Sequence, residues 1–152
     1  MNTKLSAQSV TVRREIPACA EDLFDAWLDA DSLAIWMCPG NVTHSVARLD
    51  AKPGGRFEIE MHTPDAVLLH HGTYRTVERP HRLVFTWVSG GTQQTESLVT
   101  VDFHRTRGGT EIVLLHEQLP NDAAAHAHGM GWNRIVDLLL SLVEGRHRTP
   151  IH

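Results

Sequence analysis

Residues 128–145, HGMGWNRIVDLLLSLVEG, decide the fold that we predict for this chain. Their core-facing positions recur at spacings of 4, 3, 4 and 3, which places them on one face of an α-helix. This row consists of His128, Trp132, Ile135, Leu139 and Leu142. Asn121 and Asp122 can cap the N-terminus and Gly145 can stop the helix, so we expect one long helix over about residues 121 to 144.

Two histidines near the start of this helix, His126 and His128, resemble a metal-binding pair at first sight. Residues two apart on a helix point in nearly opposite directions, so a regular helix cannot place both on one ion. We therefore expect His126 to face solvent and His128 to begin the apolar row, either at the edge of the core or against a ligand. Gly129 and Gly131 each cost a helix about 1 kcal/mol, which suggests a close backbone approach or a soft turn beside a pocket.

The chain before this helix contains segments in which apolar and polar residues alternate, the pattern of half-buried β-strands. In RFEIEMH, for example, Phe57, Ile59 and Met61 share one face. The predicted strands cover residues 9–16, 56–62, 66–78, 82–88, 96–104 and 110–117. The glycine pairs in PGG, SGG and RGG fall at turns and lack the strand–loop–helix context of a phosphate-binding loop.

Two short helices follow the first strand. Apolar residues have helical spacing from Ala20 to Leu28, and Asp31 and Ser32 are expected to cap a second turn that ends near Trp36. The order is β, α, α, several antiparallel strands and a long α, which predicts an α+β fold whose sheet wraps around the last helix. No linker or repeat divides the 152 residues, so we expect one domain over residues 1–152 with its core at about 9–145.

Composition argues against several classes of function. Lys plus Arg number 14 and Asp plus Glu 18, a net charge of −4 with no basic stripe, which disfavours nucleic-acid binding. The apolar runs are shorter than the ~20 residues of a membrane span, and the N-terminal segment lacks a signal-peptide core, so we expect a cytoplasmic protein with no membrane contact. Cys19 and Cys38 are expected to be reduced thiols, and the histidine spacings predict no metal site and no cofactor.

Several motifs occur together in a fixed order: WMCPG, KPGGRFEIEM, HGTYRTVERPHRLVFTW and HGMGW. As an ordered set they resemble the bacterial family of homologues of the activator of heat-shock protein 90 ATPase, in the START-like (SRPBCC) superfamily. The resemblance covers about residues 9–145. It implies a helix-grip fold, like that of the birch allergen, in which a curved seven-stranded antiparallel sheet holds the C-terminal helix and two short helices close one end. It also implies a cavity between sheet and helix, which in the superfamily binds lipids, hormones, polyketides or other apolar molecules.

The favoured functional hypothesis is a binding protein for a small hydrophobic or amphipathic molecule between sheet and helix. The alternative is that the inward-facing aromatic residues only fill a core, which would leave no void larger than a water or two. The residues predicted to line the cavity are Trp36, Phe57, Tyr74, Phe85, Trp87, Phe103, His116, His128, Trp132 and Ile135.

Two further hypotheses come from the superfamily and the family. An enzyme of the cyclase, dehydratase or hydrolase kind would use His116, His128 and Tyr74 as acid–base groups, provided that they converge. A co-chaperone would stimulate a chaperone ATPase through an exposed apolar patch, although the outward-facing rows of the strands are too mixed to show one. The superfamily's tendency to dimerise adds a homodimer as an expectation.

Overall fold

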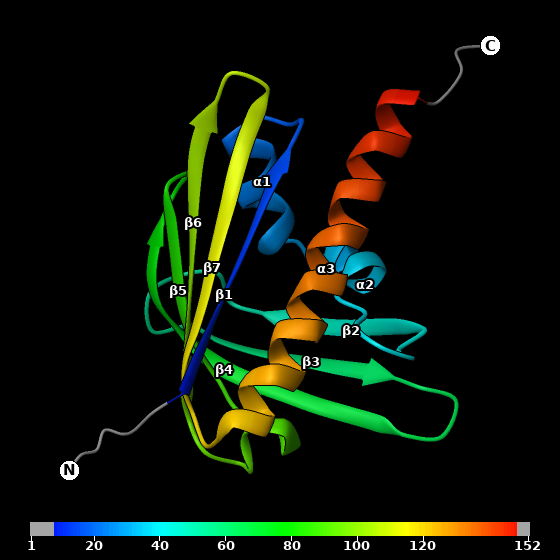
Figure 1. The fold of residues 1–152 in the computed structure, drawn as a ribbon, viewed down its shortest axis with the longest axis vertical. Helices are drawn as coiled ribbons and strands as arrows, with labels where there is room; N and C mark the ends of the chain where they lie inside the picture. The colour runs from blue at the N-terminus through cyan, green and yellow to red at the C-terminus, as the bar shows by residue number, and fades with distance from the viewer. Residues whose placement is uncertain (1–7, 149–152) are drawn as a thin grey trace.

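The structure, a computed structural model, describes residues 8–148, and over this range a seven-stranded antiparallel sheet curves around a long helix (Figure 1). The strand order across the sheet is β1-β7-β6-β5-β4-β3-β2. The helices are α1 (Ala20–Trp27), α2 (Ala30–Trp36), the 3-10 turn η1 (Gly90–Thr92) and α3 (Asp122–Arg148). The strands are β1 (Gln8–Ile16), β2 (His44–Leu49), β3 (Arg56–His62), β4 (Val67–Glu78), β5 (Arg82–Trp87), β6 (Ser97–Thr106) and β7 (Gly109–Leu119). This is the α+β helix-grip architecture expected from the sequence.

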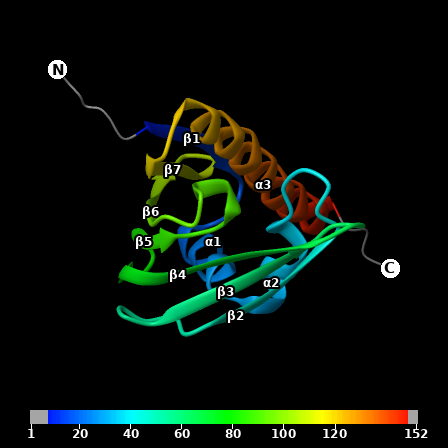
Figure 2. The ribbon, with the colours of Figure 1, turned by 90° about the horizontal axis from the view of Figure 1, so that it is seen from below.

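The sheet bends at β4, the longest strand. β2 and β3 run across the direction of β1, β6 and β7, and α3 lies along the open side of the sheet (Figures 1 and 2). β4 pairs with β3 through residues 67–73 and with β5 through residues 74–78. At this change of partner, a Cβ on Gly72 would overlap the carbonyl oxygen of Thr86 and lie 2.7 Å from the ring of Phe57. The bend therefore requires glycine here, because the two backbones approach too closely for a side chain.

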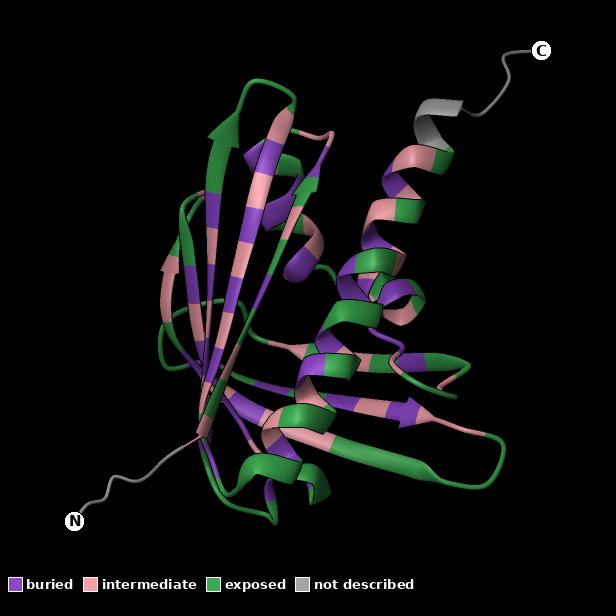
Figure 3. Ribbon diagram, viewed as in Figure 1, coloured by how far each residue is buried: buried purple, intermediate pink, exposed green. Residues whose placement is uncertain are grey.

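The predicted inward faces of the strands are buried. Phe57, Ile59 and Met61 of β3 are each at most 4% exposed, and the same alternation runs through β5, β6 and β7 (Figure 3). In β1, Val12 and Ile16 are buried, as the alternation of residues 9–16 predicts. The core thus lies between the concave face of the sheet and the helices.

The apolar row of α3 faces the sheet, and the Asn121 cap is present. Trp132 and Leu139 are buried, His128 is half-buried and His126 is exposed, as the helical spacing predicts. The Asn121 side-chain oxygen accepts a hydrogen bond from the Ala124 amide at 2.8 Å. The end of the helix differs from the prediction, because α3 continues through Gly145 to Arg148. Glycine stops a helix only where the chain turns into the left-handed conformation, and here the backbone stays helical.

Arg14 of β1 joins the first strand to this helix. Its Nη2 donates to Asn133 Oδ1 at 2.9 Å, and its Nε lies 3.1 Å from Asp137 Oδ1. Both partners are on α3, four residues apart, so one guanidinium spans a turn of the helix. The contact explains why Arg14 is only partly exposed on the inward face of β1.

Two other local features differ from the sequence prediction. β2 is absent from the strands that alternation predicts, since its inward row begins with the small polar Ser45 while Val46 is 38% exposed on the outer face. The cap of α2 is Asp29, whose side chain accepts from the Asp31 amide at 3.0 Å, rather than Asp31 itself with Ser32. Over the described residues, no helix is both long and apolar enough to cross a membrane.

Candidate functional site

A groove opens between α3, the β3–β4 hairpin and the loop after α2. It consists of two overlapping cavities with volumes of about 320 and 550 Å³. Both contain Pro39, Met61, Leu68, His70, Ala127 and Gly131 in their walls. The inner cavity adds Trp87, Trp132, Ile135 and His128, and the outer cavity adds Met130 and Arg134. These volumes fall in the ~300–1,000 Å³ range of small-molecule sites.

The register of the β3–β4 hairpin places the groove residues of β4. Leu68 pairs with Met61 and His70 pairs with Ile59, so both point to the inner face of the sheet. Leu68 is nevertheless 46% exposed, because the hairpin extends past the helix that would cover it (Figure 3). The hairpin therefore leaves one apolar wall of the groove open to solvent.

The interior at the other end of the sheet is nearly solid. One cavity of about 20 Å³ lies against α1 and α2, lined by Trp27, Leu33, Met37, Leu49, Phe57, Ile59, Tyr74, Leu83, Phe85 and Trp87. That volume accommodates about one water molecule. The indole nitrogens of Trp27 and Trp87 are buried and have no hydrogen-bond partner among residues 8–148. The groove is therefore much larger than this void. Two further cavities lie outside the void, one of about 100 Å³ between α1 and α3 and one of about 340 Å³ between β4 and η1.

His116 joins the sheet to α3 through a buried chain of hydrogen bonds. Trp132 Nε1 donates to His116 Nδ1 at 2.9 Å, so the ring proton is on Nε2, 2.8 Å from Ser97 Oγ. Ser97 Oγ donates in turn to the backbone carbonyl of Trp87 at 2.6 Å. Burial lowers the pKa of His116 to about 3, with a smaller contribution from the nearby His128. The ring is therefore neutral, and both of its nitrogens are engaged, Nδ1 with Trp132 and Nε2 with Ser97.

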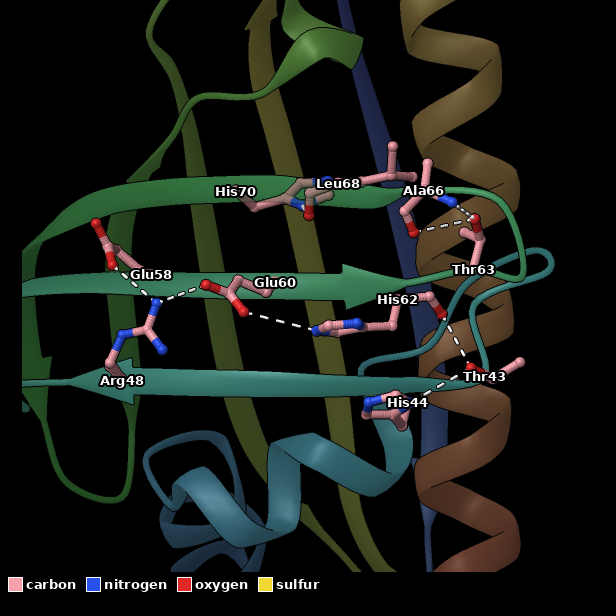
Figure 4. A network of polar contacts seen from close by, with 10 residues as sticks. All are labelled: Thr43, His44, Arg48, Glu58, Glu60, His62, Thr63, Ala66, Leu68 and His70. Carbon is pink, nitrogen blue, oxygen red and sulfur yellow. Dashed lines mark hydrogen bonds and ion pairs between the residues drawn. The ribbon is translucent and has the colours of Figure 1, made fainter.

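Two further histidines line the inner cavity. His128 Nδ1 donates to the carbonyl oxygen of Ala124 at 2.8 Å, which leaves Nε2 as the second ring nitrogen, on the side of Gly91. His70 Nδ1 lies 3.1 Å from the carbonyl oxygen of Leu68 (Figure 4). Burial lowers the pKa of His70 to about 4, so it is neutral at pH 7. The cavity thus carries a few polar groups within mainly apolar walls.

The residues predicted to line a cavity fall into three places. Trp87, His128, Trp132 and Ile135 line the inner cavity of the groove. Phe57, Tyr74 and Phe85 line only the small enclosed void. Trp36, Phe103 and His116 line neither: Trp36 packs on Trp27 at 4.9 Å between ring centroids, and Phe103 packs on Phe24 at 5.3 Å.

Sequence reasoning missed the part of the groove formed by β4 and Pro39. The alternation of residues 66–78 shows that His70 and His71 face opposite sides, but it does not say which of them faces inward. The cross-strand pairing with β3 settles this choice in favour of His70. The pairing depends on turn geometry and on contacts distant in sequence, which a single segment does not contain.

The acid–base candidates converge only in part. The rings of His116 and His128 meet edge to face with their centroids 4.8 Å apart. Tyr74 instead packs against Phe57 and Phe85, and burial raises the pKa of its hydroxyl. His116 is kept neutral by burial and is hydrogen-bonded at both ring nitrogens, so its ring positions Trp132.

The outer face of β2 and β3 carries an ionic network (Figure 4). Arg48 Nη2 lies 3.2 Å from Glu58 Oε1 and 2.8 Å from Glu60 Oε2, and the hydrogen bond from Arg48 lowers the pKa of Glu60. The rings of His44 and His62 stack beside it at 4.4 Å. In the part of the chain that the structure describes, no cluster of three or more His, Cys, Asp or Glu side chains can hold a metal ion.

Comparison with known proteins identifies the family. The solution structure of the AHSA1-like protein from Aeromonas hydrophila is 27% identical, with a TM-score of 0.77 over 95% of this chain and 99% of that one. Crystal structures of proteins from Chromobacterium violaceum and Mesorhizobium loti, each 21% identical, give TM-scores of 0.79 and 0.74. They cover 90% and 95% of this chain, and 96% and 100% of their own.

No curated protein matches the chain significantly. The family model described as activator of Hsp90 ATPase homolog 1-like protein, in contrast, matches residues 17–144, nearly the whole of the helix-grip domain. The chain therefore belongs to the family of activator of Hsp90 ATPase homolog 1-like proteins.

Proposed function

We propose that this protein binds a small, largely apolar molecule in the groove between the β3–β4 hairpin and α3. The observation that carries the proposal is the contrast in volume between the inner cavity of the groove, about 320 Å³, and the enclosed interior, about 20 Å³. The family supports a small-ligand-binding or co-chaperone-like domain in general terms. A cytoplasmic location, where the thiols of Cys19 and Cys38 stay reduced, is part of the same proposal.

The walls of the groove suit such a ligand. Met61, Trp87, Trp132 and Ile135 are nearly fully buried and contribute apolar surface, so a ligand seated there loses contact with water over most of one side. Trp132 is oriented by its hydrogen bond to His116 and by contact with Trp87, whose ring centroid lies 5.1 Å away. A wall that is already ordered costs little conformational entropy when a ligand binds.

Gly131 offers a direct test, because it faces Pro39 across the groove. An added Cβ there meets Pro39 Cβ at 3.5 Å, an ordinary contact, so the helix accepts a side chain at this position and the rest of the leucine in Gly131→Leu occupies groove space. We expect the neutral fluorophore N-phenyl-1-naphthylamine to bind the wild type with enhanced fluorescence and to bind Gly131→Leu at least tenfold more weakly.

Gly145→Leu is the matched control, since it adds the same side chain to the same helix at a position where a Cβ meets nothing within 4 Å. It should bind the fluorophore like the wild type. Equal binding by wild type and Gly131→Leu, with both folded by circular dichroism, would show that the groove is not the site.

A second candidate function is stimulation of an Hsp90-type ATPase by protein contact, in keeping with the family description. The specific observation in its favour is the tip of the β3–β4 hairpin, where Val67, Leu68 and Leu69 are 46–55% exposed, with Met130 of α3 at 65%. Leu68 and Met130 belong to the groove, whereas Val67 and Leu69 pair with His62 and Glu60 and share the outer face of the hairpin. Exposed apolar side chains that share a face can mark a contact surface. The test is the ATPase rate of the cognate chaperone with the pure protein, and with Leu69→Asp, which changes the outer face of the hairpin and spares the groove. An unchanged rate with the wild-type protein removes this candidate.

A further inference from the structure

We infer that the ligand of the groove is an amphipathic anion, whose apolar body lies in the inner cavity and whose carboxylate binds Arg134 at the outer end. The inference rests on the proposed function and names the chemical class of the ligand. Its basis is the charge of the groove walls, which differs from that of the rest of the protein.

The described residues that line the two cavities include no Asp or Glu. Their ionisable members are His70, His128 and Arg134, although the chain as a whole has a net charge of −4. His70 is neutral at pH 7, so it contributes no positive charge. Arg134 is therefore the permanent charge of the groove, and a ligand with a negative head group is complementary to it.

Arg134 also differs from most arginines of the protein in its partners. Seven arginines each lie within 4.0 Å of a carboxylate oxygen: Arg13, Arg14, Arg48, Arg75, Arg79, Arg82 and Arg105. Among residues 8–148, Arg134 has neither an ion pair nor a side-chain hydrogen bond. Its guanidinium presents donors in a planar fork that matches a carboxylate, and in this structure no side chain of the described residues occupies that fork.

The arrangement along the groove fixes the orientation of the ligand. Of the two groove cavities, Arg134, which is exposed, lines only the outer one, whereas Trp87, Trp132 and Ile135 line only the inner one. A carboxylate at the inner end would lose its hydration without gaining a cation, which is costly. A head group at Arg134 keeps contact with water while the hydrocarbon chain extends inward past Leu68 and Met61.

The experiment compares decanoate with 1-decanol, which have the same chain and different heads, as competitors of N-phenyl-1-naphthylamine. Tryptophan fluorescence follows each titration directly as well, because Trp87 and Trp132 line the inner cavity. Arg134→Gln removes the charge and keeps most of the side chain. We expect it to weaken decanoate binding about tenfold, the loss of one charge-assisted contact, and to leave 1-decanol binding unchanged.

Arg107→Gln is the matched control. Arg107 lies in the turn between β6 and β7, lines neither cavity, and also has no ion pair among the described residues. It should bind both compounds like the wild type, and Arg134→Lys should restore part of the decanoate affinity. Higher salt should weaken decanoate binding to the wild type and leave 1-decanol binding unaffected.

The outcomes separate this inference from the proposed function. If Arg134→Gln weakens the binding of both compounds equally, or of neither, the inference of an anionic head group is wrong, while the proposal of groove binding stands. If neither the fluorophore nor decanoate binds the wild type, both proposals fail. Co-sedimentation with phosphatidylglycerol vesicles but no competition by decanoate would identify a lipid surface instead. A concentration-dependent dimer that excludes the fluorophore would identify a second copy of the chain, and either result would overturn the inference.

Discussion

His116 illustrates how one buried side chain can serve the groove without touching it. It accepts from Trp132 and donates to Ser97, and both hydrogen bonds lie in the core, where an unpaired partner cannot turn to water. The ring therefore fixes the orientation of a groove-lining tryptophan from behind. Two predictions at the residue scale follow from this arrangement.

Replacing Trp132 with Phe should destabilise the protein more than replacing Trp87 with Phe. Both changes remove the same ring volume from the core, but only Trp132→Phe leaves His116 Nδ1 without a donor, because Trp87 Nε1 has no partner among the described residues. We expect the difference in the free energy of unfolding to be about 1–3 kcal/mol, measured by urea denaturation at neutral pH. Equal losses in the two variants would mean that the bond to His116 contributes nothing.

The stability of the protein should fall as pH falls below about 6.5, the pKa of histidine in an unfolded chain. The folded pKa of His116 is about 3, so between these values the unfolded state takes up a proton that the folded state does not. His116 should contribute about 1.4 kcal/mol per pH unit to this slope, and His70, with a folded pKa of about 4, should add a similar amount. Urea denaturation of His116→Asn between these two pH values should show a free energy of unfolding that depends less steeply on pH, by the contribution of His116. An unchanged dependence would contradict the low folded pKa of His116.

At the scale of the elements, glycines have opposite roles in β4 and in α3. Gly72 permits the sheet to bend, since a side chain there would meet backbone atoms of β5 that cannot rotate away. Gly131 has a low helix propensity and destabilises α3, and its missing side chain leaves space for the groove.

Gly72→Ala should therefore destabilise the protein by about 3 kcal/mol or more, whereas Gly131→Ala should stabilise it by about 1 kcal/mol. The first change forces an overlap with Thr86, and the second improves helix propensity with its nearest contact at 3.5 Å, to Pro39. Thermal unfolding of the two variants beside the wild type measures both effects. Tolerance of Gly72→Ala would show that the bend adapts more readily than this packing allows.

For the molecule as a whole, the sheet and α3 enclose a single core, so a ligand that bridges them should stabilise the entire fold. At a free decanoate concentration about 100-fold above its Kd, the free energy of unfolding should rise by about 2.7 kcal/mol. Gly131→Leu should show no such rise, because its groove is filled. Chemical denaturation with and without decanoate tests this, and an equal increase in the variant would indicate a site elsewhere.

The periodicity of the helices and strands predicts much of the fold. The spacing of His128, Trp132 and Leu139 predicts the buried face of α3 correctly, and alternation predicts the inward residues of β3. β2 escapes this reasoning, because the small polar Ser45 points inward and Val46 outward. Alternation in the sequence predicts burial only where the inward side chains are apolar and the outward side chains are polar.

Periodicity within single elements is sufficient to predict the α+β class, the separation of His126 from His128 and the aromatic residues of the core. Contacts between elements determine that Phe57, Tyr74 and Phe85 line only a small void, while Leu68 and His70 line a groove that opens toward α3. The distinction depends on strand register and on how far the β3–β4 hairpin extends past the helix. Both follow from contacts between segments far apart in the chain, which no local pattern records.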